Sequence, residues 1–238
     1  MKKLNFGKGN AKLSKEIYTF SLPAGYTCPA AHLCASYADR QTGKITDGKD
    51  MVFRCFAASQ ESTFPNVRAA RWHNFDMLAK VKTDSFAMAS LILSSLDNSA
   101  KIVRIHVSGD FFNAAYFRAW CYVAMHRPET KFYAYTKSVN IVAHNMHMIP
   151  DNLILTLSEG GRHDELINHL GMKTAKVVFS EDEALALSLE VDHDDSHAMD
   201  GNESFALLIH GTQAKGSNAS NAIKAMKVKG TKFSYSNK

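Results

Sequence analysis

The stretch "KIVRIHVSGDFFNAAYFRAWCYVAMHR" (residues 101–127), followed by "KFYAYTKS" (residues 131–138), decides the fold that this sequence predicts. An apolar run from Ile102 to Val107 stops at a Gly-Asp pair, which is typical of a buried strand that ends in a turn. The next residues have helical spacing, and a second apolar run follows them. A strand, a helix and another strand in this order indicate a parallel α/β sheet.

The same alternation extends in both directions along the chain. Strands are expected over residues 16–24, 51–57, 152–161, 175–181 and 204–211, and helices over 61–82, 85–96, 139–148 and 182–188. We therefore predict an α/β fold whose mostly parallel sheet is closed or partly closed into a barrel. It would form one domain over residues 1–238, with peripheral basic ends at about 1–15 and 218–238.

Composition restricts the class of protein. The chain has 238 residues, of which 45% are hydrophobic, so it is long enough to bury a substantial core. It has no apolar run of bilayer length, and the basic N-terminus lacks the apolar segment of a signal peptide. These features predict a cytoplasmic protein whose thiols stay reduced.

The formal net charge of +5 is concentrated at the two ends of the chain. Basic tails of this kind either are solvated or contact nucleic-acid phosphates, and the solvated alternative is the more common. The residues concerned are Lys2, Lys3, Lys8, Lys12 and Lys15 at one end, and Lys215, Lys224, Lys227, Lys229, Lys232 and Lys238 at the other.

Three cysteines form the first candidate site. Cys28 and Cys34 lie in the loop after the first expected strand, and Cys55 follows further along. Three thiolates suit a [4Fe-4S] cluster with one open iron, and three thiolates with His32 or His106 would suit zinc. The alternative is that the thiols are inert and buried, as we expect for Cys121 on its apolar helix.

Polar residues recur where the expected strands end. In parallel α/β folds the site is built at these carboxyl ends. Gly109 frees the backbone, Asp110 and Glu159 offer carboxylates, and Lys137 and Arg162 offer positive charge, so we expect these residues to bind a cofactor. The alternative is ordinary loop polarity. No P-loop, dinucleotide-binding fingerprint or nucleophile elbow is present.

The stretch "EVDHDDSHA" (residues 190–198) is the third candidate. Asp192, His193, Asp194 and His197 offer carboxylate and imidazole groups, which serve as general acids and bases or as ligands of Mg, Mn, Zn or Fe(II). The alternative is a solvated acidic loop that caps turns.

Long motifs across the chain resemble the gene product eighty-eight family of phages and mobile elements. They are "KGNAKLSKEIYTFSLPAGYTCPAAHLC", "FRCFAASQE", "RWHNFD", "RIHVSGDFF", "FYAYTKS" and "LEVDHDDSHA", within roughly residues 5–220. The resemblance implies a protein carried by a phage, prophage or plasmid, and implies no particular chemistry. If a phage encodes the protein, the predicted location is the cytoplasm of the host cell.

A looser resemblance is to radical S-adenosylmethionine enzymes. Their partial α/β barrels carry a three-cysteine loop after the first strand and a Gly-acidic turn after the second. Cys28, Cys34 and Gly109-Asp110 match these places, whereas Cys55 lies far downstream of the loop. The resemblance implies an iron-sulfur cluster, S-adenosylmethionine as cofactor and Asp110 as a cofactor-binding residue.

These observations lead to three hypotheses. The first is an iron-sulfur enzyme with its site at the strand ends. In it, Asp192, His193, Asp194 and His197 act on a small-molecule or nucleotide substrate or hold a second metal. The second is a metal-dependent nuclease or phosphoesterase that uses the same Asp-His residues. The third is a non-enzymatic protein that binds nucleic acid through its basic ends. The sequence does not specify substrate, metal or oligomeric state.

Overall fold

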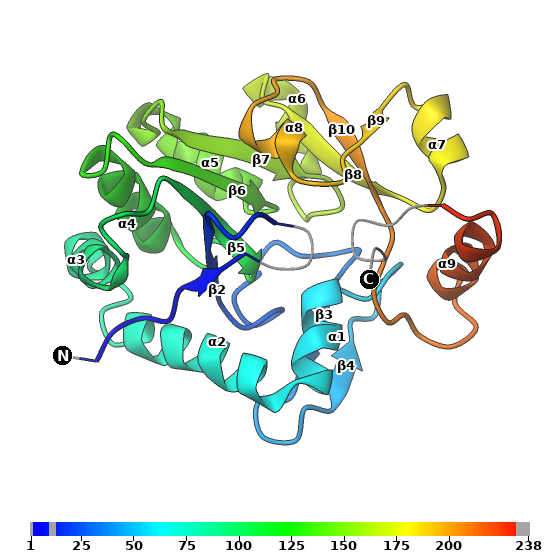
Figure 1. The fold of residues 1–238 in the computed structure, drawn as a ribbon, viewed down its shortest axis with the longest axis horizontal. Coiled ribbons are helices and arrows are strands. Elements are labelled where there is room, and N and C mark those ends of the chain that lie inside the picture. Colours follow the sequence, from blue (N-terminus) through cyan, green and yellow to red (C-terminus); the bar gives the residue numbers. More distant parts are fainter. Residues whose placement is uncertain (1, 10–12, 232–238) are drawn as a thin grey trace.

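A computed structural model describes residues 2–9 and 13–231 of the chain. It contains one large sheet with helices packed around it (Figure 1). The strands are β1 (Gly7–Lys8), β2 (Ile17–Ser21), β3 (Ser36–Ala38), β4 (Ile45–Asp47), β5 (Ile102–Ser108), β6 (Lys131–Thr136), β7 (Leu153–Ser158), β8 (Thr174–Val178), β9 (Glu190–Val191) and β10 (Phe205–Leu208). The α-helices are α1 (Phe56–Thr63), α2 (Pro65–Ala79), α3 (Ser85–Ser95), α4 (Ala114–Met125), α5 (Val139–Asn145), α6 (Ile167–Leu170), α7 (Glu181–Ala186), α8 (Ser196–Met199) and α9 (Asn218–Val228). Two short 3-10 helices lie at Met146–Met148 and Asp164–Leu166.

The large sheet has the strand order β1-β2-β5-β6-β7-β8-β10-β9. Every neighbouring pair is parallel except β1 with β2, so the α/β class and the mostly parallel sheet are confirmed. Among the described residues, no pairing joins the end strands β1 and β9, so a closed barrel is not detected there.

One predicted strand is wrong. Residues 51–57 form a loop and the first turn of α1, and the two-stranded antiparallel sheet β3–β4 precedes them. Cys55 is the N-cap residue of α1, and Arg54 is held to Asp47 of β4 by a two-pronged ion pair. The apolar letters of this segment are shared between the loop and the helix, which is why a short apolar run cannot be assigned to a strand by periodicity alone.

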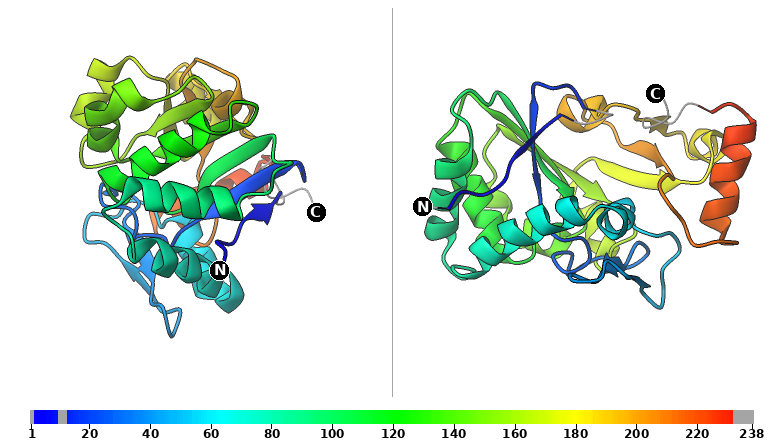
Figure 2. Two further views of the ribbon diagram at one scale, coloured as in Figure 1. Left: turned by 90° about the vertical axis from the view of Figure 1, so that its left-hand side faces the viewer. Right: turned by 60° about the horizontal axis from the view of Figure 1, so that its bottom comes forward.

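The two faces of the sheet are covered differently. Helices α3 and α4 pack on one face of the sheet, here called the outer face (Figure 2). Phe20, Val103 and Phe132 lie with residues of both helices in the largest hydrophobic cluster of the described residues. The inner face carries Tyr133 and Phe205, and the short helix α8 contributes Ala198 to the cluster there. Alternation of side chains along each strand produces this division.

Both ends of the chain contribute to packing. Leu4 is buried in the outer-face core and Leu13 in the inner-face cluster. Helix α9 buries Ala219 and Met226 against β8 and β10. The predicted peripheral ends are thus partly built into the fold, while Lys12, Lys232 and Lys238 lie outside the described residues. No helix in the described ranges has both the length and the apolar character needed to span a bilayer.

Candidate functional site at the carboxyl ends of the strands

The loop that carries Cys28 and Cys34 crosses the carboxyl end of the sheet. It leaves β2 and is fastened to the segment that follows β7, three strands away in the sheet order. The amide of Leu33 donates to the Gly160 carbonyl at 3.0 Å, and the amide of Arg162 donates to the Ala30 carbonyl at 2.9 Å. An antiparallel bridge between Ala31 and Gly161 completes the attachment. The loop therefore spans the strand ends and brings its thiols there.

Ser36 brings Cys55 to the same place. Its hydroxyl donates to the Cys34 carbonyl at 3.3 Å and accepts from the Cys55 amide at 2.9 Å. The amide of Val52 also donates to the Leu33 carbonyl, at 2.8 Å. Cys34 and Cys55 are thus neighbours, although the β3–β4 hairpin separates them in the sequence.

The three thiols share one electrostatic environment. Cys28, Cys34 and Cys55 are free and partly accessible, whereas Cys121 is buried in the core as predicted. Burial raises the pKa of the Cys34 thiol to about 11, and Lys137 opposes this rise. Burial also raises the pKa of Cys28, as do the nearby charges of Asp110, Cys55 and Cys34. The fold therefore favours protonated thiols, and a metal that binds them would have to displace protons.

The histidines considered as a fourth ligand lie apart from one another. His32 pairs with Asp50 at 3.4 Å on the surface of the cysteine loop. His106 is buried under α4, where its Nε2 lies 3.1 Å from the Tyr116 hydroxyl. Burial lowers the pKa of His106 to about 3, so this side chain is a neutral core residue. Within the described part of the chain, no group of three or more His, Cys, Asp or Glu side chains has the geometry of a metal site.

Gly109 and Asp110 join the cysteine loop to the strand ends. A Cβ atom on Gly109 would lie 2.5 Å from Thr27 Oγ1, and Gly109 has φ +85°, so both space and backbone require glycine. The Asp110 carboxylate is buried and accepts from Thr136 Oγ1 at 2.6 Å and from the Lys137 amide at 2.8 Å. Burial raises the pKa of Asp110 against these donors. Asp110 thus ties the ends of β5 and β6 together.

The other predicted cofactor-binding residues differ in their surroundings. The Lys137 ammonium donates to Ser158 Oγ at 2.8 Å and also to the Glu159 carbonyl. The Glu159 carboxylate pairs with Lys176 at 2.8 Å and turns towards β8. Arg162 has an exposed side chain, and its amide fixes the cysteine loop. The structure therefore brings Lys137 to the thiols and places the side chain of Glu159 with Lys176.

The Asp-His stretch lies on the inner face of the sheet. Asp195 is buried and pairs with Arg104 of β5, and it accepts from the Tyr133 hydroxyl at 3.1 Å. His197 lies 3.6 Å from Asp192 and 3.1 Å from Glu190. His193 and Asp194 are exposed. The structure thus brings Asp192 and His197 together, leaves the His193 side chain exposed, and uses Asp195 to hold the segment against the sheet.

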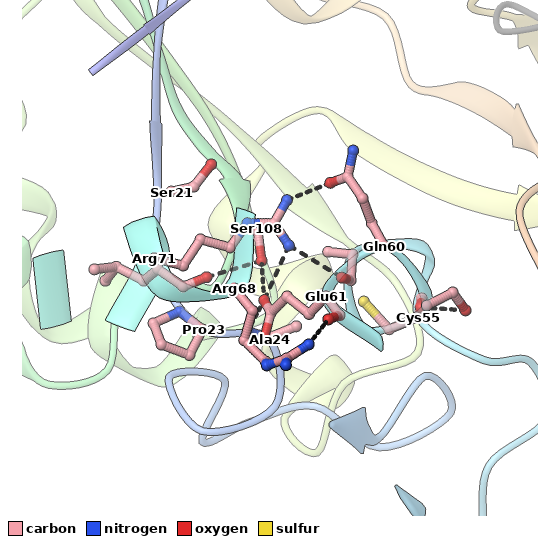
Figure 3. A network of polar contacts seen from close by, with 12 residues as sticks. Ser21, Pro23, Ala24, Cys55, Gln60, Glu61, Arg68, Arg71 and Ser108 are labelled. Carbon is pink, nitrogen blue, oxygen red and sulfur yellow. Dashed lines mark hydrogen bonds and ion pairs between the residues drawn. The ribbon is translucent and has the colours of Figure 1, made fainter. Parts of the chain in front are cut away.

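A buried ion pair next to the cysteines was not among the expected site residues. Glu61 of α1 accepts at one oxygen from Arg71 Nη1 at 2.9 Å, from the Ala24 amide at 2.8 Å and from Ser108 Oγ at 3.2 Å (Figure 3). Glu61 therefore connects the ends of β2 and β5 to helices α1 and α2. The charge of Arg71 also lowers the pKa of Cys55, against the larger effect of burial, which raises it.

Signals for these residues were present in the sequence. Glu61 ends the stretch "FRCFAASQE" and Arg71 begins "RWHNFD", two of the motifs that carry the family resemblance. Opposite charges at the near ends of two motifs indicate a pair, although nothing in the letters shows that the pair is buried. Ser36 has no such signal.

Comparison with known proteins supports the family resemblance that the sequence motifs carry. A family model described as Gene product 88 matches residues 3–228. The chain belongs to this family. The Gene 88 protein of Mycobacterium phage L5 is 29% identical over 113 residues, which are 44% of this chain and 46% of the phage protein. The Gene 88 protein of Mycobacterium phage D29 is 29% identical over 90 residues, which are 35% of this chain and 38% of that protein.

The alignments thus span about half of the curated relatives, or less. No solved structure matches the chain. The phage family is confirmed, and the resemblance to radical S-adenosylmethionine enzymes has no support among these proteins.

Proposed function

We propose that this member of the Gene product 88 family is a metalloenzyme that holds an iron-sulfur cluster on Cys28, Cys34 and Cys55. The observation that carries the proposal is that these thiols, from two distant stretches of chain, lie close enough to influence one another's charge at the carboxyl ends of parallel strands, although in the described residues they are not arranged as a metal site. Loops at this edge are where parallel α/β enzymes build their sites.

The donor set suits a cluster better than a single hard cation. Thiolates hold iron-sulfur clusters, and three of them leave one iron open to another ligand. The three cysteine residues are partly exposed, whereas Cys121 is buried in the core. When bound, such a cluster supplies electron transfer or a Lewis-acidic iron.

The protein groups around the thiols have separate tasks in this proposal. Lys137 offsets negative charge near Cys34, because its ammonium lowers the pKa of that thiol. Ser36 fixes the Cys55 amide relative to the Cys34 carbonyl. Asp110 holds the ends of β5 and β6 at a fixed separation. S-adenosylmethionine as a second cofactor remains a proposal with no supporting contact, since both Asp110 oxygens already accept protein donors.

The alternatives stay predictions that no observation favours. A metal-dependent nuclease or phosphoesterase would need Asp192, His193, Asp194 and His197 around a cation, and His193 lines a pocket with Glu181 and Asp182 of α7. Nucleic-acid binding through the basic ends would involve α9, whose Lys229 pairs with Asp182 of α7. Zinc on the three thiols is an outcome that the following test separates from a cluster.

The test is anaerobic reconstitution of the full chain with iron and sulfide, followed by a visible spectrum and analysis for iron, sulfide and zinc. We expect broad visible absorption that is lost in Cys28→Ala, Cys34→Ala and Cys55→Ala but kept in Cys121→Ala, the matched control in the core. Absence of bound iron, or a spectrum unchanged in Cys28→Ala, would overturn the proposal. Stoichiometric zinc that excludes iron would replace the cluster with a structural zinc site.

A further inference from the structure

His210 lies just beyond the end of β10, outside the set of residues assigned above to the cluster. The strand pairs with β8, and the Ile209 amide extends this pairing by donating to the Val178 carbonyl at 2.8 Å. The chain then runs past α1 towards α9 (Figure 1). His210 therefore lies at the carboxyl edge of the parallel sheet, the edge that the cysteine loop crosses.

The segment after β10 is fastened to the residue that precedes Cys55. The Gln213 side chain accepts from the Arg54 amide at 2.7 Å and donates to the Arg54 carbonyl at 3.0 Å. The same Gln213 nitrogen donates to the His210 carbonyl at 2.9 Å. The carbonyls of Arg54 and His210 thus share one donor, which holds the end of β10 against the start of α1.

The residue that follows Cys55 contacts the same segment. The centroid of the His210 ring lies 4.5 Å from that of the Phe56 ring. Gly211 has φ +79°, and a Cβ atom there would lie 2.7 Å from Phe56 Cδ2, so this close approach requires glycine. Together with the Gln213 bonds, these contacts place His210 against the short stretch that has Cys55 at its centre.

An imidazole suits the metals that thiolates hold. Histidine replaces cysteine on iron in some iron-sulfur clusters, and three cysteines with one histidine form a common zinc site. The histidines expected from the sequence are engaged elsewhere, since His32 pairs with Asp50 and His106 is buried in the core. The described side chains do not already surround one point, so the His210 ring and the thiols would have to turn about their side-chain bonds to share a metal.

We propose that His210 is the fourth protein ligand of the metal held by Cys28, Cys34 and Cys55. The inference rests on the proposed function, because it takes the three thiols as metal ligands. It also narrows that function. A [4Fe-4S] cluster with a protein ligand on every iron leaves no iron open, so a substrate would not bind directly to the metal.

The probe is Co²⁺, added without oxygen to the cluster-free full-length chain and followed by its thiolate-to-cobalt absorption. We expect saturable binding that is lost in Cys55→Ala and at least about tenfold weaker in His210→Ala. Added imidazole should restore part of the affinity of His210→Ala, which the loss of a merely structural side chain would not allow. The matched control is His32→Ala on the cysteine loop, which should keep the affinity of the unmodified chain.

A second measurement needs no variant. The chain is labelled with ¹⁵N-histidine and reconstituted with iron and sulfide, and the reduced cluster should show hyperfine coupling to one histidine nitrogen. Equal Co²⁺ affinity in the unmodified chain and His210→Ala, or no saturable Co²⁺ absorption, would overturn the inference. A cluster without histidine coupling would overturn it too and leave the proposed cluster intact. Co²⁺ binding that depends on His210, in a chain that takes up no iron, would instead overturn the cluster and support a four-ligand site for a single ion.

Discussion

Glu61→Gln tests the energetic importance of the buried ion pair. The substitution keeps the size and shape of the side chain but removes the negative charge that faces Arg71 at 2.9 Å. Glu61 is fully buried and Arg71 nearly so, so the guanidinium would be left without a counter-charge and without access to water.

The size of the effect follows from that burial. Removing one partner of a buried ion pair costs about 3–5 kcal/mol, because the remaining charge stays desolvated. The Ala24 amide and Ser108 hydroxyl keep an acceptor in the glutamine oxygen, which places the expected loss at the lower end, about 3 kcal/mol. Asp76→Asn breaks the exposed pair with Arg40 instead and should cost at most about 1 kcal/mol.

Urea unfolding at pH 7, followed by both circular dichroism and tryptophan fluorescence, measures the difference. We expect a lower midpoint for Glu61→Gln with an unchanged slope, and a small shift for Asp76→Asn. The double variant Glu61→Leu/Arg71→Met should recover part of the loss, since it leaves neither charge uncompensated. If Glu61→Gln were no more destabilising than Asp76→Asn, the reasoning from burial would be refuted.

Three further predictions concern the strand ends and the inner face. Gly109→Ala places a Cβ atom at positive φ, 2.5 Å from Thr27 Oγ1 and 2.7 Å from Leu22 Cβ. The melting temperature of this variant should therefore fall further than that of Gly216→Ala, because Gly216 also has positive φ (+80°) but nothing within 4 Å. Equal melting temperatures would show that Thr27 and Leu22 move aside. Burial raises the pKa values of Cys28, Cys34 and Cys55. The folded state therefore keeps thiol protons that the unfolded chain loses above about pH 8.5. The free energy of unfolding should fall as pH rises from about 8.5 towards the folded-state pKa of about 11 for Cys34. Urea midpoints at pH 8 and pH 9.5 measure this, and a triple Cys→Ala variant at these positions should lose less stability over that interval; an equal loss would assign the effect to other groups. Asp195→Asn removes the charge that faces Arg104 and should lower the free energy of unfolding by about 3 kcal/mol. The control, Asp194→Asn at an exposed position, should lower it by less than about 1 kcal/mol. Similar urea midpoints for the two variants would contradict a structural role for Asp195.

The fold was predictable where strands are long and buried on both faces. The runs at Ile102–Ser108 and Lys131–Thr136 are mostly apolar and are parallel neighbours in the sheet. The short segments were not predictable in this way. Residues 51–57 are apolar in part because they include the start of a helix, with Cys55 as its N-cap and Phe56 as its first residue. Strand β9 has only two residues, too few to show an alternating pattern.

The candidate site was predictable as a location and less so as a set of partners. Cys28, Cys34, Asp110 and Lys137 meet because the carboxyl ends of parallel strands share one edge. Asp195 is different, because its role depends on Arg104 and Tyr133, which lie in strands far away in the sequence. No local pattern reports such a pairing, since it arises only when the 190–200 segment folds back over the sheet.

The β3–β4 hairpin has a consequence for how relatives of this protein are found. It leaves the cysteine loop just after Cys34, closes on itself through the pairs Ser36–Asp47 and Ala38–Ile45, and returns the chain to Cys55. Its tip is held to α2, because Arg68 donates to the carbonyl of Arg40. A change in hairpin length would therefore alter the number of letters between the two cysteines without moving either sulfur. A search that requires three closely spaced cysteines would discard this chain, whereas one that allows a folded insertion between the second and third would retain it.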